Sequence, residues 1–209
     1  MSLETWLSFA FASAIVLLIP GPTILLVIST TLSHGRRAAM ASVIGVGLGD
    51  LVAVTLSLIG LGAIVATSAT LFTALKWVGA AYLIYLGIQK WRSRPQAMAV
   101  DGDRRPPPPN RILIRQSFVV TVLNPKSIAF FIAFLPQFMS VGAPIAPQMG
   151  ILASTFVILA IANAVLYVFA ADAMRRAIRR PSILRWAERL SGSILIGAGV
   201  MTATLRRST

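Results

Sequence analysis

Residues 18–23 read LIPGPT, and they interrupt an apolar run at residues 7–29 that reads LSFAFASAIVLLIPGPTILLVIS. A run of this length is sufficient to cross the hydrocarbon core of a bilayer as one helix. Pro20, Gly21 and Pro22 are nevertheless the poorest helix formers, because proline removes a backbone donor and glycine adds conformational freedom. The stretch therefore predicts a membrane-spanning helix that is broken inside the membrane.

The composition is that of an integral membrane protein. Of the 209 residues, 56% are hydrophobic and only 12% are charged, with a mean hydropathy of +0.81. Soluble domains carry about 25% charged residues, so this chain has too few polar side chains to cover a soluble surface. Long apolar segments predict an all-α membrane protein with six transmembrane helices. The segments are residues 5–30, 40–66, 71–90, 112–138, 149–173 and 190–205.

The net charge of +13 comes from basic residues in the connections between the apolar segments. No soluble fold is expected to present them to a nucleic acid, so we expect anionic lipid headgroups as their partners. Most of them lie in the first, third and fifth connections, which the positive-inside rule places in the cytoplasm, with both termini outside. These cations are Arg36, Arg37, Lys90, Arg92, Arg94, Arg104, Arg105, Arg111, Arg115, Arg175, Arg176, Arg179, Arg180, Arg185 and Arg189.

The chain divides into two halves of three segments each. Residues 93–111 contain four consecutive prolines and mixed charge, which is typical of an extended cytoplasmic linker. The linker separates residues 1–92 from residues 112–209. Because three crossings are an odd number, the second half would enter the membrane inverted relative to the first. We therefore predict a 3+3 inverted repeat, an arrangement typical of secondary transporters.

Matching motifs in the two halves support this internal repeat. IPGPTI in the first segment and LNPKSI in the fourth are both broken by proline. Asp50 and Asn163 lie at matching places in the second and fifth segments, and Gly79 and Gly192 in the third and sixth. In inverted-repeat transporters, paired breaks of this kind mark the substrate site. The break residues expected to line a shared cavity are Pro20, Gly21, Pro22 and Pro125.

Asp50 is expected near the middle of the membrane. It lies about ten residues into the second segment, which corresponds to ~15 Å at 1.5 Å per residue in a core of ~30 Å. A carboxylate at that depth costs at least ~2.5 kcal/mol, so it must face a cavity or a partner. Asp50 is therefore a candidate proton carrier or a ligand for a substrate cation. A carboxyl group that only ties helices together would give the same sequence.

Lys126 is expected at a similar depth in the fourth segment, directly after Asn124 and Pro125. Pro125 frees carbonyl groups of the preceding turn, and Asn124 can both donate and accept hydrogen bonds there. Lys126 and Asn124 are thus candidate ligands for a substrate carboxylate. A lysine that extends to the interface, or that pairs with Asp50, would also fit. Asn163 fits substrate binding and a simple hydrogen bond between helices equally well.

One buried anion and one buried cation are complementary to a zwitterion such as an amino acid, although a structural salt bridge would need the same residues. Enzyme activity is not expected. The chain has no GxxxxGK[ST] phosphate loop, no cysteine and a single histidine. We therefore predict no catalytic residues, no cofactor and no metal site.

Four motifs together resemble the LysE/RhtB family of amino-acid exporters. They are IPGPT at 19–23, GVGLGD at 45–50, WVGAAYLIYLG at 77–87 and NPK at 124–126. The resemblance extends over nearly the whole chain. It implies efflux of amino acids or close analogues through the bacterial inner membrane, driven by the proton-motive force, and hence proton antiport with alternating access. The family's motif positions fall here on Pro20, Gly21, Pro22, Asp50, Asn124, Pro125 and Lys126.

Two other functions fit parts of the sequence. A non-coupled channel or pore would also use broken helices and buried polar groups. Related proteins export cadmium, but soft-metal binding would be difficult in a chain without cysteine. The sequence is compatible with a homo-oligomer, and it does not specify which amino acid is carried.

Overall fold

The computed structural model describes residues 1–67, 69–92, 106–139, 143–173 and 181–204. These residues form helices and short links, and they contain no strand, so the predicted all-helical fold is confirmed. The elements are α1 (Leu3–Leu18), α2 (Pro22–His34), α3 (Arg36–Thr67), α4 (Ala69–Arg92), α5 (Asn110–Val122), α6 (Pro125–Phe134), the 3-10 helix η1 (Leu135–Phe138), α7 (Ile145–Ala173) and α8 (Pro181–Thr204).

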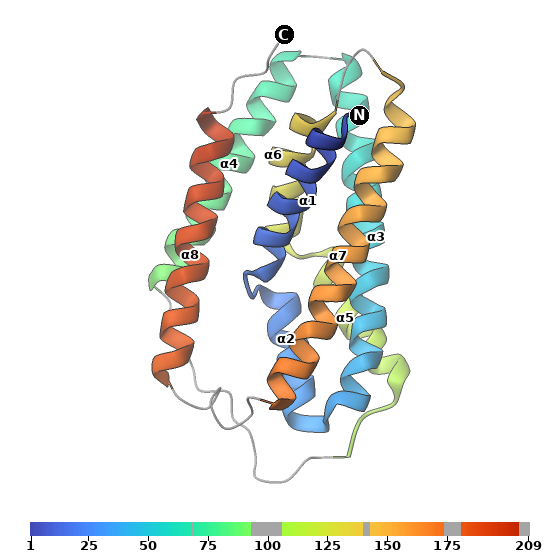
Figure 1. Cartoon of the computed structure of the whole chain (residues 1–209), viewed down its shortest axis with the longest axis vertical. Helices are drawn as coiled ribbons and strands as arrows, with labels where there is room; N and C mark the ends of the chain where they lie inside the picture. The colour runs from blue at the N-terminus through green and yellow to red at the C-terminus, as the bar shows by residue number, and fades with distance from the viewer. Residues whose placement is uncertain (68, 93–105, 140–142, 174–180, 205–209) are drawn as a thin grey trace.

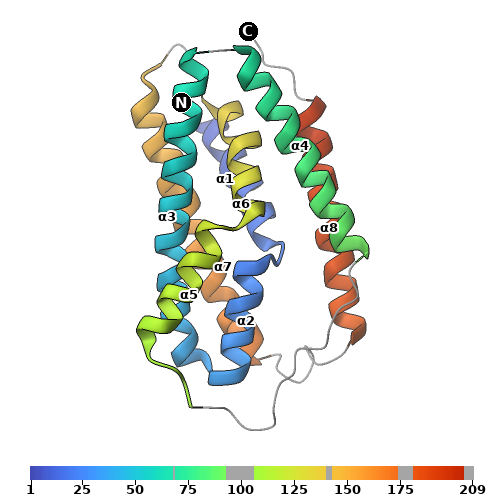
Figure 2. The same cartoon turned by 180° about the vertical axis from the view of Figure 1, so that it is seen from behind.

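Four of the helices form two broken pairs. The chain bends by 53° between α1 and α2, and by 43° between α5 and the segment formed by α6 and η1. The pairs run in opposite directions, since α1 and α2 lead away from the end of the molecule that α6 approaches (Figure 1). α7 likewise runs opposite to α3, and α8 runs opposite to α4 (Figures 1 and 2). Each element of the second half is therefore antiparallel to its counterpart in the first.

The helices are those of a membrane protein. By length and composition, α7 and residues Arg36–Gly60 of α3 are each able to cross a membrane. If each bent pair is one crossing, the described residues supply up to four such spans. In α4 the apolar stretch found is shorter, at Ala80–Gln89. α8 begins at Pro181 rather than at Leu190, because the sequence ILRWAER is helical as well.

α4 and α8 pack closely through glycines. A Cβ atom added to Gly192 would lie 2.6 Å from the carbonyl oxygen of Gly87, and one added to Gly87 would lie 2.7 Å from that of Gly192. Small residues permit such close approach of two backbones in a membrane. Next to this contact, Trp91 Nε1 donates a hydrogen bond to Ser193 Oγ at 2.9 Å. Both views show the two helices side by side along one flank of the molecule (Figures 1 and 2).

The helices enclose two buried apolar clusters. The first is rich in aromatic side chains from α1, α6 and α7, and Phe131 and Phe156 pack edge to face at 4.7 Å between ring centroids. The second is aliphatic, between α2, α3 and α7, and includes Val27, Val43 and Val168. The helix breaks lie where the two clusters meet.

Candidate functional site

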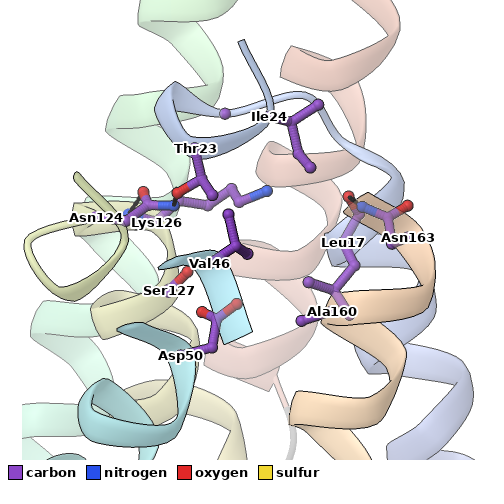
Figure 3. Close-up of a pocket in the computed structure, with 11 residues that line it drawn as sticks. Leu17, Thr23, Ile24, Val46, Asp50, Asn124, Lys126, Ser127, Ala160 and Asn163 are labelled. Atoms are coloured by element: carbon purple, nitrogen blue, oxygen red, sulfur yellow. Dashed lines mark hydrogen bonds between the residues drawn. The ribbon is translucent and has the colours of Figure 1, made fainter. Parts of the chain in front are cut away.

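A small cavity lies between the two helix breaks (Figure 3). Its volume is about 20 Å³, which is room for about one ordered water. The lining comes from five helices and the two links at the breaks, and it combines polar and apolar side chains. It consists of Leu17, Gly21, Thr23, Ile24, Val46, Asp50, Asn124, Lys126, Ser127, Ala160 and Asn163.

The first break leaves the last carbonyl groups of α1 without the partners of a continuing helix, as at any helix C-terminus, although the Val16 oxygen also accepts a hydrogen bond from the Ile19 N–H at 3.2 Å. Side chains from the second half of the chain satisfy them. Lys126 Nζ donates to the Val16 oxygen at 3.1 Å and to the Ile19 oxygen at 2.7 Å. The intervening carbonyl groups of Leu17 and Leu18 are bound by two side chains of α7. Their donors are Asn163 Nδ2 at 2.9 Å and Tyr167 Oη at 2.6 Å.

The second break is organised by Asn124. Its Oδ1 accepts a hydrogen bond from the Lys126 backbone N–H at 3.1 Å, so Asn124 caps the N-terminus of α6, and Pro125 takes the first helical position. Its Nδ2 donates to Thr23 Oγ1 at 3.1 Å, directly after the first break. Thr121 Oγ1 also approaches Thr23 Oγ1, at 3.3 Å. Asn124 therefore holds the two breaks together.

Lys126 lies against the backbone of the first break. A Cβ atom on Gly21 would be 3.3 Å from Lys126 Cε and 3.4 Å from Nζ, which is closer than ordinary van der Waals contact. Gly21 therefore provides the space in which the lysine side chain passes to α1. Lys126 is buried, with 7% of its surface exposed, and its charge is stabilised by backbone carbonyl groups.

Asp50 is buried on α3, with 3% of its surface exposed. Figure 3 shows its carboxylate on the side of the cavity opposite to Thr23 and Lys126. The cavity thus has an acidic wall and a basic wall.

The structure brings together most of the residues selected from the sequence. Asp50, Asn124, Lys126 and Asn163 all line the cavity, and so does Gly21. The described lining does not include Pro20, Pro22 or Pro125, which lie in or beside the links. The prolines therefore shape the breaks, whereas the glycine and the polar residues face the cavity.

Several residues of the site were not selected from the sequence, Tyr167 and Thr23 among them. Tyr167 lies four positions after Asn163, which places both side chains on one face of α7. That spacing was the available signal for Tyr167. Thr23 directly follows the first break, but its partners Thr121 and Asn124 are 98 and 101 positions away, so its role depends on the tertiary fold. Among the described residues, no group of three or more His, Cys, Asp or Glu side chains could hold a metal ion.

Comparison with known proteins gives a consistent result. The chain is 35% identical over 206 residues to an uncharacterized membrane protein of Vibrio cholerae, covering 99% of this chain and all of that one. It is 32% identical to a homoserine/homoserine lactone efflux protein of Salmonella typhimurium over the full length of both chains. It is 26% identical to a leucine efflux protein of Klebsiella pneumoniae, over 96% of this chain and 95% of that one.

No solved structure matches the chain significantly. The sequence profile of a family described as LysE type translocator matches residues 14–205, and the resemblance inferred from the four motifs is thereby confirmed. Translocators move solutes and do not transform them, so the chain is a transporter and not an enzyme. This chain belongs to the LysE type translocator family.

Proposed function

We propose that this transporter exports an amino acid or a close analogue across the bacterial inner membrane in exchange for protons. The names of the homoserine/homoserine lactone and leucine efflux proteins support the substrate class. The observation on which the proposal depends is that one cavity holds both Asp50 and Lys126 between two helix breaks. An acidic wall and a basic wall are complementary to the ammonium and carboxylate groups of a zwitterion.

In this mechanism Asp50 exchanges a proton or binds the substrate ammonium, and Lys126 binds the substrate carboxylate. Asn124 and Asn163 position the breaks around the substrate, since both already bond across the cavity to the other half of the chain. Pro20, Pro22 and Pro125 keep the helices open at this depth. The apolar clusters on the two sides of the cavity would open one after the other, so that the cavity is accessible first from one side of the membrane and then from the other, as alternating access requires.

The antiparallel course of the paired elements supports a 3+3 inverted repeat of residues 1–92 and 112–209, joined by the cytoplasmic linker at 93–111. The positive-inside rule supports the orientation. The N-terminal ends of α3 and α5 lie at one end of the molecule, and α4 runs toward that end (Figure 1). They carry Arg36, Arg37, Arg92 and Arg111. We assign this end to the cytoplasm, and both termini to the outside.

The proposal is tested in everted membrane vesicles, whose lumen corresponds to the cell exterior. An acidic lumen should drive accumulation of L-homoserine or L-leucine against its gradient, and an uncoupler should abolish this accumulation. Equilibration without accumulation would instead support a channel. No movement of either amino acid would overturn the proposed substrate class.

The role of Asp50 is tested by Asp50→Asn. We expect gradient-driven accumulation to fall by at least about tenfold, since removing a proton-transfer group typically costs about 10²–10⁴ in rate. Exchange of labelled for unlabelled substrate, which needs no net proton movement, should persist. Asp172→Asn makes the same change at the end of α7 and serves as the control. Equal accumulation by wild type and Asp50→Asn would exclude Asp50 from coupling.

A further inference from the structure

We infer that the backbone carbonyl groups of Val16 and Ile19 are the binding site for the ammonium group of the substrate, and that Lys126 occupies this site between transport events. The inference rests on the proposed export function and assigns atoms to it. Lys126 Nζ donates to both carbonyl oxygens, at 3.1 and 2.7 Å. A lysine side chain ends in a primary ammonium with three donors, and the amino group of an amino acid is the same chemical group.

The site is already built in this structure. The two acceptors belong to the last turn of α1 and the residue after it, where the helix dipole places partial negative charge. The intervening carbonyl groups of Leu17 and Leu18 are fixed by Asn163 and Tyr167. The Val16 and Ile19 carbonyl groups therefore keep their positions when the ammonium that binds them changes.

Lys126 has to move before an amino acid can bind. The cavity of about 20 Å³ is far below the ~300–1,000 Å³ of ordinary small-molecule sites. Lys126 is the flexible part of its wall, a four-carbon chain that passes beside Gly21 without any intervening side chain. Once displaced, its ammonium can bind the substrate carboxylate in the same cavity. Asp50 on the opposite wall is then available for the proton.

The relatives fit this assignment. One of them is named for the efflux of both homoserine and homoserine lactone. The two compounds share an α-ammonium group, but ring closure removes the carboxylate from the lactone. A site that recognises the ammonium through backbone carbonyl groups accepts both, whereas a site that depends on the carboxylate accepts only homoserine.

The test measures binding of three probes to the purified full-length protein in nanodiscs at mildly acidic pH. L-homoserine carries both charges, homoserine lactone only the ammonium, and 2,4-dihydroxybutyrate only the carboxylate. In Lys126→Met we expect about tenfold tighter binding of the lactone, because it no longer competes with a charge-assisted hydrogen-bonded group. The same substitution should weaken 2,4-dihydroxybutyrate binding by at least about tenfold. Lys76→Met, the same change in α4, should leave all three affinities unchanged.

Asp50→Asn provides a second arm that leaves Lys126 in place. If the carbonyl groups hold the ammonium, lactone binding to Asp50→Asn should weaken by less than about threefold. A loss of more than about tenfold would assign the ammonium to Asp50 and overturn the inference, as would unchanged or weaker lactone binding to folded Lys126→Met. If either of these contradicting results is obtained while wild-type vesicles transport both homoserine and the lactone, the carbonyl site is wrong but the proposed export function stands. If they transport neither, the proposed function fails and the site assignment fails with it.

Discussion

Gly21 is needed for space rather than for backbone conformation. Its φ of −103° and ψ of −172° define an extended backbone that any residue can adopt. An added Cβ would, however, lie 3.3 Å from Lys126 Cε. A glycine in a proline-rich motif is usually explained by its conformational freedom. Here the close approach of the Lys126 side chain explains the glycine better.

Gly21→Ala should therefore impair transport more than folding. We expect the initial rate of amino-acid uptake into everted vesicles to fall by about tenfold, since overpacking a filled site costs ~1–3 kcal/mol. The amount of monodisperse protein extracted from the membrane should stay the same. Gly60→Ala on α3 is the control, because nothing lies within 4 Å of its added Cβ. A normal rate in Gly21→Ala would mean that Lys126 adapts without loss.

Single residues show what the sequence could reveal and what it could not. Asp50 and Lys126 were identifiable because an ionisable side chain inside a membrane is energetically costly and therefore indicates a functional site. Asn124 was selected as a ligand for substrate, yet its amide caps α6 and bonds to Thr23. The cap is local and could have been expected from its place before Pro125. The bond to Thr23 joins residues 101 positions apart, and no local pattern specifies such a contact.

At the scale of elements, the C-terminus of α1 presents a set of backbone acceptors, and side chains of other helices donate hydrogen bonds to them. Within a helix the last carbonyl groups lack N–H partners, and in a membrane water does not replace them freely. Here α6 supplies Lys126 for two of them, and α7 supplies Asn163 and Tyr167 for the others. The broken helix is thus stabilised by tertiary hydrogen bonds rather than by its own sequence.

Tyr167→Phe removes one of these bonds without changing the ring. We expect the free energy of unfolding to fall by ~0.5–1.5 kcal/mol, because the Leu18 carbonyl loses its donor while the apolar contacts remain. Reversible unfolding in mixed micelles measures the change. Tyr85→Phe is a matched control on the exposed face of α4, where 56% of the side chain is accessible. Equal losses in both variants would deny a specific role to the Tyr167 hydroxyl.

Replacing both Pro20 and Pro22 by alanine tests the break itself. Alanine would allow α1 and α2 to approach one continuous helix, which would withdraw the carbonyl groups that now face Lys126 and α7. We expect correct insertion but at least about tenfold slower uptake into vesicles, because displacing a reacting group by ~1 Å can cost 10²-fold. A protein that no longer reaches the membrane would give the prolines a purely structural role.

The helix breaks were predictable because proline acts locally, and the structure has them at residues 19–21 and 123–124. The bend angles were not predictable, because they depend on how α3 and α7 pack against each half-helix. α8 begins before the apolar segment that starts at Leu190, because the basic residues of ILRWAER interrupt the apolar pattern but not the helix.

At the scale of the whole molecule, the cavity separates two apolar clusters of different character. The aromatic cluster of Phe9, Phe130, Phe131, Phe134 and Phe156 lies on one side. The aliphatic cluster between α2, α3 and α7 lies on the other. None of the lining residues of the cavity comes from α4 or α8, and these two helices pack mainly on each other.

Close packing of α4 and α8 makes a clear prediction about stability. Gly192→Ala should lower the free energy of unfolding by ~1–3 kcal/mol, because its Cβ would meet the Gly87 carbonyl oxygen at 2.6 Å. Gly197→Ala on the same helix should raise the free energy of unfolding by ~0.5–1 kcal/mol, since nothing lies within 4 Å of its Cβ and alanine favours helix. Melting temperatures in one detergent compare the two variants directly. A lower melting temperature for Gly197→Ala than for Gly192→Ala would contradict the packing argument.

The acceptors at the end of α1 also have a consequence for biogenesis. The ribosome makes Val16, Leu17, Leu18 and Ile19 more than a hundred residues before Lys126, Asn163 and Tyr167. During synthesis the first half of the chain is therefore inserted with carbonyl groups whose side-chain donors do not yet exist. Water or a protein of the insertion machinery must donate hydrogen bonds to these carbonyl groups until α6 and α7 have been inserted. The two halves are thus not independent, since side chains of the second half complete the hydrogen bonding of the first.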